Sequence, residues 1–186
     1  GSMFLLICLV VIYGGYVNGS AYETLGDTGK LTFSSTSSKT KFTKIKTIRK
    51  SVNGFDIGDV DNDGVKELVV SVPSDKQVLV YDTQYKLKYT ISFNESPRVI
   101  LISDLDDDGK NELIVGTSEG WNYGQKGYAY VGEVGNNGNF SIEWKSPAYY
   151  LRLATEFAVG DLDSDGKKEL VMGLSWWDRK LVSYEY

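Results

Sequence analysis

The sequence predicts an all-β protein, and three observations support this fold class. Short apolar runs rich in Val, Ile, Leu and Tyr alternate with turn-forming Gly, Asp and Asn. No amphipathic helical periodicity of useful length runs through the chain. One nine-residue pattern, D-x-D-x-D-G-x-x-E, occurs three times, each time between two apolar runs. The 186 residues are the length of one ordinary domain, which we expect to be built from repeated hairpins.

The repeated pattern has the composition of a calcium-binding loop. Carboxylates at positions 1, 3 and 5 can converge on one point, and Gly at position 6 allows φ > 0. The carbonyl of position 7 and the acid of position 9 would complete an all-oxygen shell, which suits Ca²⁺ better than Mg²⁺. Zn²⁺ prefers nitrogen and sulfur ligands, and the chain contains no His.

The sequence therefore predicts three Ca²⁺ ions, one in each loop. The expected ligands are Asp59, Asp61, Asp63, Val65 and Glu67 in loop 1; Asp104, Asp106, Asp108, Lys110 and Glu112 in loop 2; and Asp161, Asp163, Asp165, Lys167 and Glu169 in loop 3. An EF-hand also begins D-x-D-x-D-G, but it needs Glu at position 12 and flanking helices. Here position 12 is Val70, Val115 or Met172, and the flanks have strand composition. The other alternative is three acidic turns that hold no metal.

The loops and their flanks resemble the FG-GAP/VCBS repeat of integrin-α propellers and their microbial relatives. Phe55-Asp56-Ile57-Gly58 precedes loop 1, and Val72-Pro73 follows its second strand. Phe157-Ala158-Val159-Gly160 precedes loop 3, and Gly173 follows it. Around loop 2 the counterparts are Ile102-Ser103 and Gly116. Position 9 is Glu where that family usually has Asp, and the resemblance covers residues 54–186.

This resemblance implies a β-propeller of four-stranded antiparallel blades. Loop 1 and loop 2 begin 45 residues apart (104 − 59) and loops 2 and 3 begin 57 apart (161 − 104), spacings that suit such blades. The blades are expected near 54–93, 99–145 and 156–186, the last without its outer strand. The expected strands are 54–60, 66–72, 77–82, 86–93, 99–105, 111–117, 127–134, 139–145, 156–162, 168–174 and 180–186.

The expected blade count leaves the ring open. With the N-terminal strands, the chain supplies about three and a half to four blades, whereas propellers usually close with four to eight. The N-terminal strands would complete the last blade, or the chain would belong to a larger propeller. A third alternative is self-association, in which two chains share one ring.

The N-terminal segment has two alternative interpretations. Gly1-Ser2 before Met3 is typical of a cloning remnant. The apolar run that follows is either a secretory signal with a cleavage zone near Gly19–Ala21 or a buried strand of a partial blade. The domain organisation that we predict is therefore 1–21 as this leader and 22–186 as propeller, with a hairpin turn at Gly26–Gly29.

A basic segment precedes the first blade. Residues 39–50 carry six Lys and Arg side chains and no acid. They would form either a polyanion-binding strip or, as we favour, an outer edge strand that its lysines protect from pairing.

Charge and cysteine content favour an extracellular setting. The net charge is −5, and three Ca²⁺ would change it to about +1, so the acids are explained by metal and not by a cationic partner. The single cysteine, Cys8, precedes the repeats, so they contain no disulfide framework. Calcium sites of this kind are often weak and need the high calcium concentration found outside cells.

The residues favour a binding module over an enzyme. Without His no Ser-His-Asp triad can form, no nucleotide-binding glycine motif is present, and nearly all clustered acids are used as calcium ligands. A polysaccharide- or lipid-active enzyme domain, or its accessory module, is the alternative. Recognition of an extracellular protein or glycan, and not of nucleic acid, is expected on the loops opposite the metal. The candidate contact residues are Trp121, Tyr123, Tyr149, Arg152, Trp176, Trp177 and Arg179, whose alternative role is packing between blades.

Overall fold

The protein is described by a computed structural model, which divides the chain into two compact units, residues 1–47 and 48–186. The structure describes residues 20–25, 31–36, 43–119, 126–149, 154–174 and 180–186. In the first unit, β1 (Ser20–Leu25) and β2 (Leu31–Thr36) pair antiparallel, while the predicted turn at Gly26–Gly29 lies outside the described residues. The boundary between the units falls inside the single propeller domain that the sequence predicts for 22–186.

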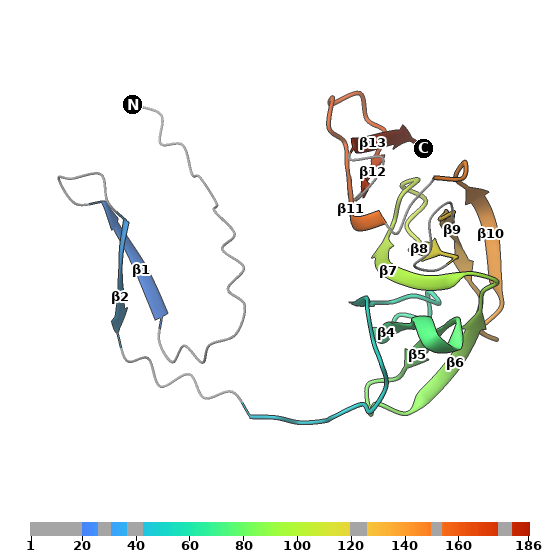
Figure 1. Cartoon of the computed structure of the whole chain (residues 1–186), viewed down its shortest axis with the longest axis horizontal. Helices are drawn as coiled ribbons and strands as arrows, with labels where there is room; N and C mark the ends of the chain where they lie inside the picture. Colours follow the sequence, from blue (N-terminus) through green and yellow to red (C-terminus); the bar gives the residue numbers. More distant parts are fainter. Residues whose placement is uncertain (1–19, 26–30, 37–42, 120–125, 150–153, 175–179) are drawn as a thin grey trace. The chain divides into compact units, whose positions relative to one another are not determined.

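The second unit contains three antiparallel sheets, which we call blades 1, 2 and 3 (Figure 1). Blade 1 consists of β3 (Phe55–Gly58), β4 (Glu67–Val72), β5 (Gln77–Tyr81) and β6 (Leu87–Ser92), with a 3₁₀ turn, η1 (Pro73–Asp75), between β4 and β5. Blade 2 consists of β7 (Ser96–Ser103), β8 (Glu112–Ser118), β9 (Ala129–Val134) and β10 (Phe140–Lys145). Blade 3 consists of β11 (Ala154–Gly160), β12 (Glu169–Leu174) and β13 (Lys180–Glu185).

The all-β, blade-like architecture confirms the predicted fold class. Within each blade every strand pairs with the next one along the chain, as expected for short β-branched runs joined by tight turns. Blade 3 has three described strands, in agreement with the predicted lack of an outer strand. The blades do not close into a ring within the described part of the chain.

Two apolar layers hold the blades together. Side chains alternate between the two faces of a strand, so each blade can pack on a neighbour on both sides. The layer between blades 1 and 2 contains the buried side chains Val60, Val69, Val78, Val80, Ile91, Ile100, Leu113, Val115 and Val134. The layer between blades 2 and 3 contains Leu105, Ile114, Ala129, Val131, Phe157, Leu170, Met172 and Leu174.

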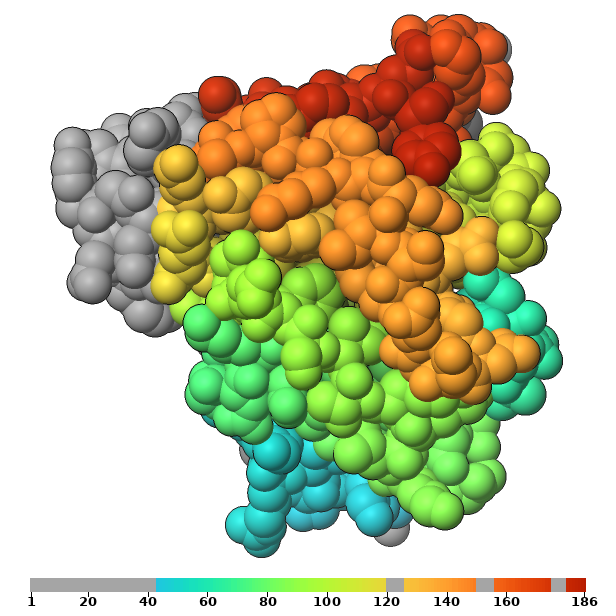
Figure 2. Space-filling model, turned by 90° about the vertical axis from the view of Figure 1, so that its right-hand side faces the viewer, coloured from blue at the N-terminus to red at the C-terminus, as the bar shows by residue number. Residues whose placement is uncertain are grey.

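Blade 2 is therefore covered on both faces, whereas blades 1 and 3 each have one face turned away from it. All seven residues of its strand β8 are buried. The space-filling view shows the three blades stacked in chain order, from green through orange to red (Figure 2). The innermost strands also touch, β3 with β7 and β7 with β11. The three loops that follow these inner strands are thereby brought to the same end of the stack.

One predicted element is wrong and others lie outside the described residues. Residues 43–50 were expected to belong to an edge strand, but they form no strand. Most are exposed, so water can satisfy their backbone groups without a partner strand. The two alternatives for residues 3–19, a signal or a strand, concern residues outside the described ranges. Lys39 and Lys41 of the basic segment also lie outside them. No helix in the described part is long and apolar enough to cross a membrane.

Candidate metal centre

The three acidic loops adopt the same backbone conformation. The glycine at position 6 has a positive φ of 89°, 87° and 92° at Gly64, Gly109 and Gly166, as the sequence predicts. Position 4 is also left-handed, with φ of 57°, 61° and 65° at Asn62, Asp107 and Ser164. Asn and Asp tolerate this conformation better than other L-residues, which is a signal that the sequence analysis missed.

Hydrogen bonds from the backbone fix the carboxylates at positions 1 and 5. The carboxylate of position 1 accepts from the glycine N–H at 2.9, 3.1 and 3.1 Å in loops 1, 2 and 3. The carboxylate of position 5 accepts from the N–H of position 7 at 2.8, 2.8 and 2.9 Å. These bonds use only part of each carboxylate, so the remaining lone pairs stay available for a cation.

The glutamate at position 9 anchors the start of each loop. Glu67, Glu112 and Glu169 are almost completely buried. One oxygen of each accepts a hydrogen bond from the N–H of position 2, at 3.2 Å for Glu67 and 2.6 Å for Glu169. The longer side chain, where the resembling family usually has Asp, therefore reaches across the loop.

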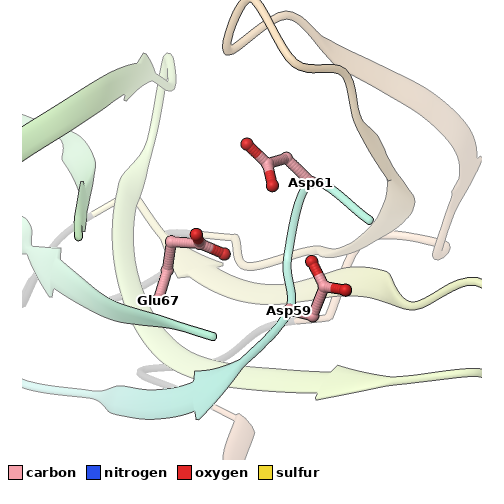
Figure 3. Close-up of side chains that lie close together, drawn as sticks. All are labelled: Asp59, Asp61 and Glu67. Carbon is pink, nitrogen blue, oxygen red and sulfur yellow. The ribbon is translucent and has the colours of Figure 1, made fainter. Parts of the chain in front are cut away.

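Each loop brings three carboxylates to one point. In loop 1, oxygens of Asp59, Asp61 and Glu67 lie within 4.8 Å of one another, and Figure 3 shows these side chains around a common space. Loop 2 gathers Asp104, Asp106 and Asp108 in this way, and loop 3 gathers Asp161, Asp163 and Glu169. A further group joins Asp165 and Glu169 to Glu185 of β13, a residue that the sequence analysis did not include.

The fourth predicted acid stands apart from these groups in loops 1 and 2. Asp63 contacts Lys88, and Glu112 bonds to the backbone of Leu105. Val65, Lys110 and Lys167 are the predicted carbonyl ligands, and the backbone N–H of each donates to the carboxylate at position 5. The ammonium groups of Lys110 and Lys167 pair with Glu133 and Glu185.

Unsatisfied atoms and burial fit a cation at these points. Asp61 Oδ1 and Asp104 Oδ1 are buried without a hydrogen-bond partner, although Lys168 Nζ lies 3.9 Å from the latter. Burial raises the pKa of Glu112 to about 7, against the effect of its backbone hydrogen bond, and burial also raises the pKa of Glu67. A divalent ion with oxygen ligands would satisfy the free oxygens and favour the charged carboxylates.

Loop 1 differs from the others because a lysine from β6 reaches into it. Lys88 Nζ lies 2.8 Å from Asp61, 2.7 Å from Asp63 and 3.0 Å from Glu67. Burial opposes its charge, but these hydrogen bonds outweigh burial and raise the pKa of Lys88, while the same contact lowers the pKa of Asp63. The Tyr89 hydroxyl also donates to Asp61 at 2.8 Å. The ammonium group of Lys88 therefore lies among the carboxylates of loop 1, where a metal ion would otherwise bind.

Replacing Lys88 by Met is expected to strengthen calcium binding at loop 1 by about tenfold, equivalent to about 1.4 kcal/mol. Ca²⁺ would then no longer compete with the ammonium group for Asp61, Asp63 and Glu67. Calorimetric titration with CaCl₂ measures this change. The exposed Lys86, just before the same strand, provides the control Lys86→Met. An affinity that is equal in both variants would show that Lys88 does not occupy the calcium position.

Hydrogen bonds link each loop to the next. Asn111, at position 8 of loop 2, donates to the Asp59 carbonyl of loop 1 at 3.0 Å and also bonds to Asn62. Lys168, at position 8 of loop 3, donates to the Asp104 carbonyl of loop 2 at 2.6 Å and pairs with Asp107. Position 8 thus contacts the position 1 carbonyl of the preceding loop at both junctions, which places the three loops in a row.

Most predicted contact residues of the opposite end lie outside the described ranges. These are Trp121, Tyr123, Arg152, Trp176, Trp177 and Arg179. Tyr149 is described, and it is half-buried against the layer between blades 2 and 3, where its hydroxyl bonds to that of Tyr184. Lys180 Nζ lies 5.5 Å from the centre of its ring.

Two comparisons with known proteins agree with this geometry. Residues 104–172, from the start of loop 2 to strand β12, match the family model of the FG-GAP-like repeat. The KICSTOR complex protein ITFG2 of Bos taurus is 26% identical over 135 residues, which cover 70% of this chain and 25% of that protein. The chain thus spans about a quarter of the length of the curated relative that it matches.

Proposed function

We propose that this chain is a calcium-stabilised β-propeller module of the FG-GAP-like repeat type that recognises another macromolecule; the match of residues 104–172 to that repeat supports this. Calcium would bind in the three acidic loops at one end of the blades. The contact surface would be formed by the loops at the other end. The single observation that supports this most strongly is the repetition of one loop conformation, with the same carboxylate hydrogen bonds, in three blades.

Three calcium sites are supported by the chemistry of the donors. Each loop offers carboxylate oxygens, and one such atom in loop 1, Asp61 Oδ1, and one in loop 2, Asp104 Oδ1, are buried without a hydrogen-bond partner. Clustered carboxylates repel one another when no cation is bound, so the loops would be strained without metal. A bound ion would reduce this repulsion and fix the connection between the first and second strands of each blade.

An extracellular setting is part of the proposal. Calcium sites of this kind are often weak and then need the high calcium concentration found outside cells. The recognition would then be of a secreted or cell-surface kind, such as adhesion. Measured calcium affinities far tighter than the millimolar range would remove this argument.

We propose a non-catalytic role for the clustered acids. They accept backbone hydrogen bonds within the loops, and a Ca²⁺ ion would use their remaining oxygens. Acids committed in this way are poor general acids or nucleophiles. The calcium would therefore support the scaffold and would not take part in a reaction.

The proposed contact surface lies at the end opposite the metal. In an antiparallel meander, connections alternate between the two ends of the sheet, so the second-to-third connections lie away from the calcium loops. The longest of these is the 119–128 connection in blade 2. Its base is fastened by the backbone bond from Glu119 to Lys126 and by the bridge between Gly127 and Tyr149. A loop on such a rigid base is suited to recognition.

A protein or a glycan would fit this surface. Trp, Tyr and Arg give much of the energy of protein contacts, and aromatic rings also suit sugars. The name of the relative from Bos taurus assigns that protein to a complex, which supports a protein partner for the present chain. Nucleic acid is not expected, since the net charge is −5.

Replacing Trp121, Tyr123 and Trp177 together by Ala is expected to reduce binding of the protein or glycan partner at least tenfold. Each aromatic residue at the centre of an interface often contributes about 2 kcal/mol or more to binding. Binding would be measured on a glycan array and on a panel of cell surfaces. Calcium affinity should stay unchanged, since none of these three residues belongs to the acidic loops. This second measurement separates lost contacts from lost folding.

The matched control neutralises the basic segment. Changing Lys41, Lys44 and Lys46 to Gln should leave binding intact. If binding instead survives the aromatic changes and disappears in this control, the basic segment is the contact surface and the proposed end is wrong.

A further inference from the structure

Each blade uses its two faces for different neighbours. We call the face that packs on the following blade the leading face, and the other the trailing face. The leading faces are those of Val69 and Val80 in blade 1 and of Ile114 and Val131 in blade 2. The trailing faces are those of Leu113 and Val115 in blade 2 and of Leu170 and Met172 in blade 3. The same kind of interface, leading on trailing, therefore occurs twice within one chain.

Within the described part of the second unit, no blade covers the trailing face of blade 1. Ile100, Phe157 and Phe55 occupy the same position, since they pair with Val115, Met172 and Val70 in the three blades. Ile100 and Phe157 are 7% and 8% exposed, whereas Phe55 is 69% exposed. Its neighbour Ile57 is also exposed. The outer half of this face is covered, because Ile48 packs against the buried cluster of Val70, Val72, Leu79 and Tyr81.

The leading face of blade 3 is open in the same way. Position 2 of the loops is Val60, Leu105 and Leu162, whose exposed fractions are 0%, 1% and 76%. Leu181 of β13 is exposed too, while its counterparts Val78 and Ala129 are buried between blades. The sequence thus keeps apolar side chains at both ends of the stack, in positions that a neighbouring blade buries elsewhere.

We propose that a second copy of this chain covers both ends, with the leading face of blade 3 packed on the trailing face of blade 1 in the other copy. One chain carries both halves of an interface that it already makes twice, so no other partner chemistry is required. Two copies of the three described blades give six, within the range of four to eight in which propellers close. One copy gives three and three copies give nine, both outside that range. A head-to-tail pair of this kind closes with two equivalent junctions.

The loops supply a polar counterpart to this junction. Position 8 donates to the position 1 carbonyl of the preceding loop in both junctions within the chain, through Asn111 and Lys168. The residue at position 8 of loop 1 is Lys66, which is exposed. In the pair of copies, Lys66 would donate to the Asp161 carbonyl of the other copy. The third junction would then repeat both the apolar and the polar contacts of the first two.

Light scattering after size exclusion, with calcium present, tests this inference on the full chain. The expected mass is twice the 20.7 kDa of one chain. Phe55→Asp and Leu162→Asp should each reduce the mass to that of one chain, and because both residues are exposed, each chain should still fold, as circular dichroism would verify. Ile142→Asp, at an exposed position of the outer strand β10, should leave the pair intact.

Mixing the two variants gives the decisive observation. One junction of the mixed pair would contain neither substitution, so the mixture of Phe55→Asp and Leu162→Asp should recover pairs that neither variant forms alone. An interface between two identical faces would not behave in this way. A wild-type mass of one chain, or a pair that withstands both substitutions, would overturn the proposal and assign the two faces to another segment or partner. Loss of partner binding without a change of mass would concern only the recognition role proposed above.

Discussion

Chelation of calcium with EDTA is expected to lower Tm by roughly 10–20 °C, on the usual scale of about 2–4 °C per kcal/mol for a protein of this size. The reason is mass action. A site with a Kd of about 0.1 mM in about 2 mM Ca²⁺ contributes RT ln(1 + 20), about 1.8 kcal/mol, so three sites contribute about 5 kcal/mol. Thermal unfolding followed by circular dichroism, with calcium and then with EDTA, measures the difference.

A single-site variant sharpens this test. Glu112→Gln removes one charge from loop 2 but keeps an oxygen for the Leu105 N–H. In calcium it should lower Tm, because Glu112 is the ligand predicted at position 9, although it stands apart from the carboxylate group of Asp104, Asp106 and Asp108. In EDTA it should not, because the pKa of Glu112 is raised by burial and its charge is a cost without metal. The control Asp107→Asn removes an equal charge at position 4 of the same loop, where the side chain is exposed and pairs with Lys168. If Tm is unchanged by EDTA, the loops are stable without metal.

Leu105→Ala is expected to lower the free energy of unfolding by about 2–5 kcal/mol, as large-to-small changes in a core do. Leu105 is 1% exposed and belongs to the layer between blades 2 and 3, so the shorter side chain would leave a cavity there. Urea unfolding followed by tryptophan fluorescence gives the free energy. The control is Ile142→Ala, at a site that is 53% exposed, where a change within about 0.5 kcal/mol is expected. Equal losses in the two variants would mean that blades 2 and 3 do not pack as described.

The strands and the conformation of the three acidic loops were predictable because their signals are local. Alternation of apolar residues, the glycine at position 6 and the acids at fixed offsets all lie within one hairpin, and the structure contains the corresponding strands and positive φ angles. The three-stranded form of blade 3 followed from counting the same signals. These features depend on neighbours in sequence, which the chain displays directly.

Features that depend on distant residues were not predictable. Lys88 reaches loop 1 from β6, and Glu185 approaches Glu169 because β13 pairs with β12, so only the three-dimensional register reveals either contact. The prediction of an edge strand in residues 43–50 was wrong. A lysine-rich composition is typical of a protected edge strand, but it does not show whether a partner strand lies beside it. Tyr149 was singled out as an aromatic of a contact loop, while its half-buried position comes from packing between blades.

The bonds between successive loops have a consequence for how the chain unfolds. Each blade of the described stack contacts only the next one, through an apolar layer and the position 8 donors Asn111 and Lys168. Such an array behaves like a row of nearest neighbours, in which stability is the sum of the units and of the contacts between them. Blade 2 takes part in two contacts and the outer blades in one each. Fraying in a single chain would therefore begin at the outer blades, and the amides of β8 would be the last to open.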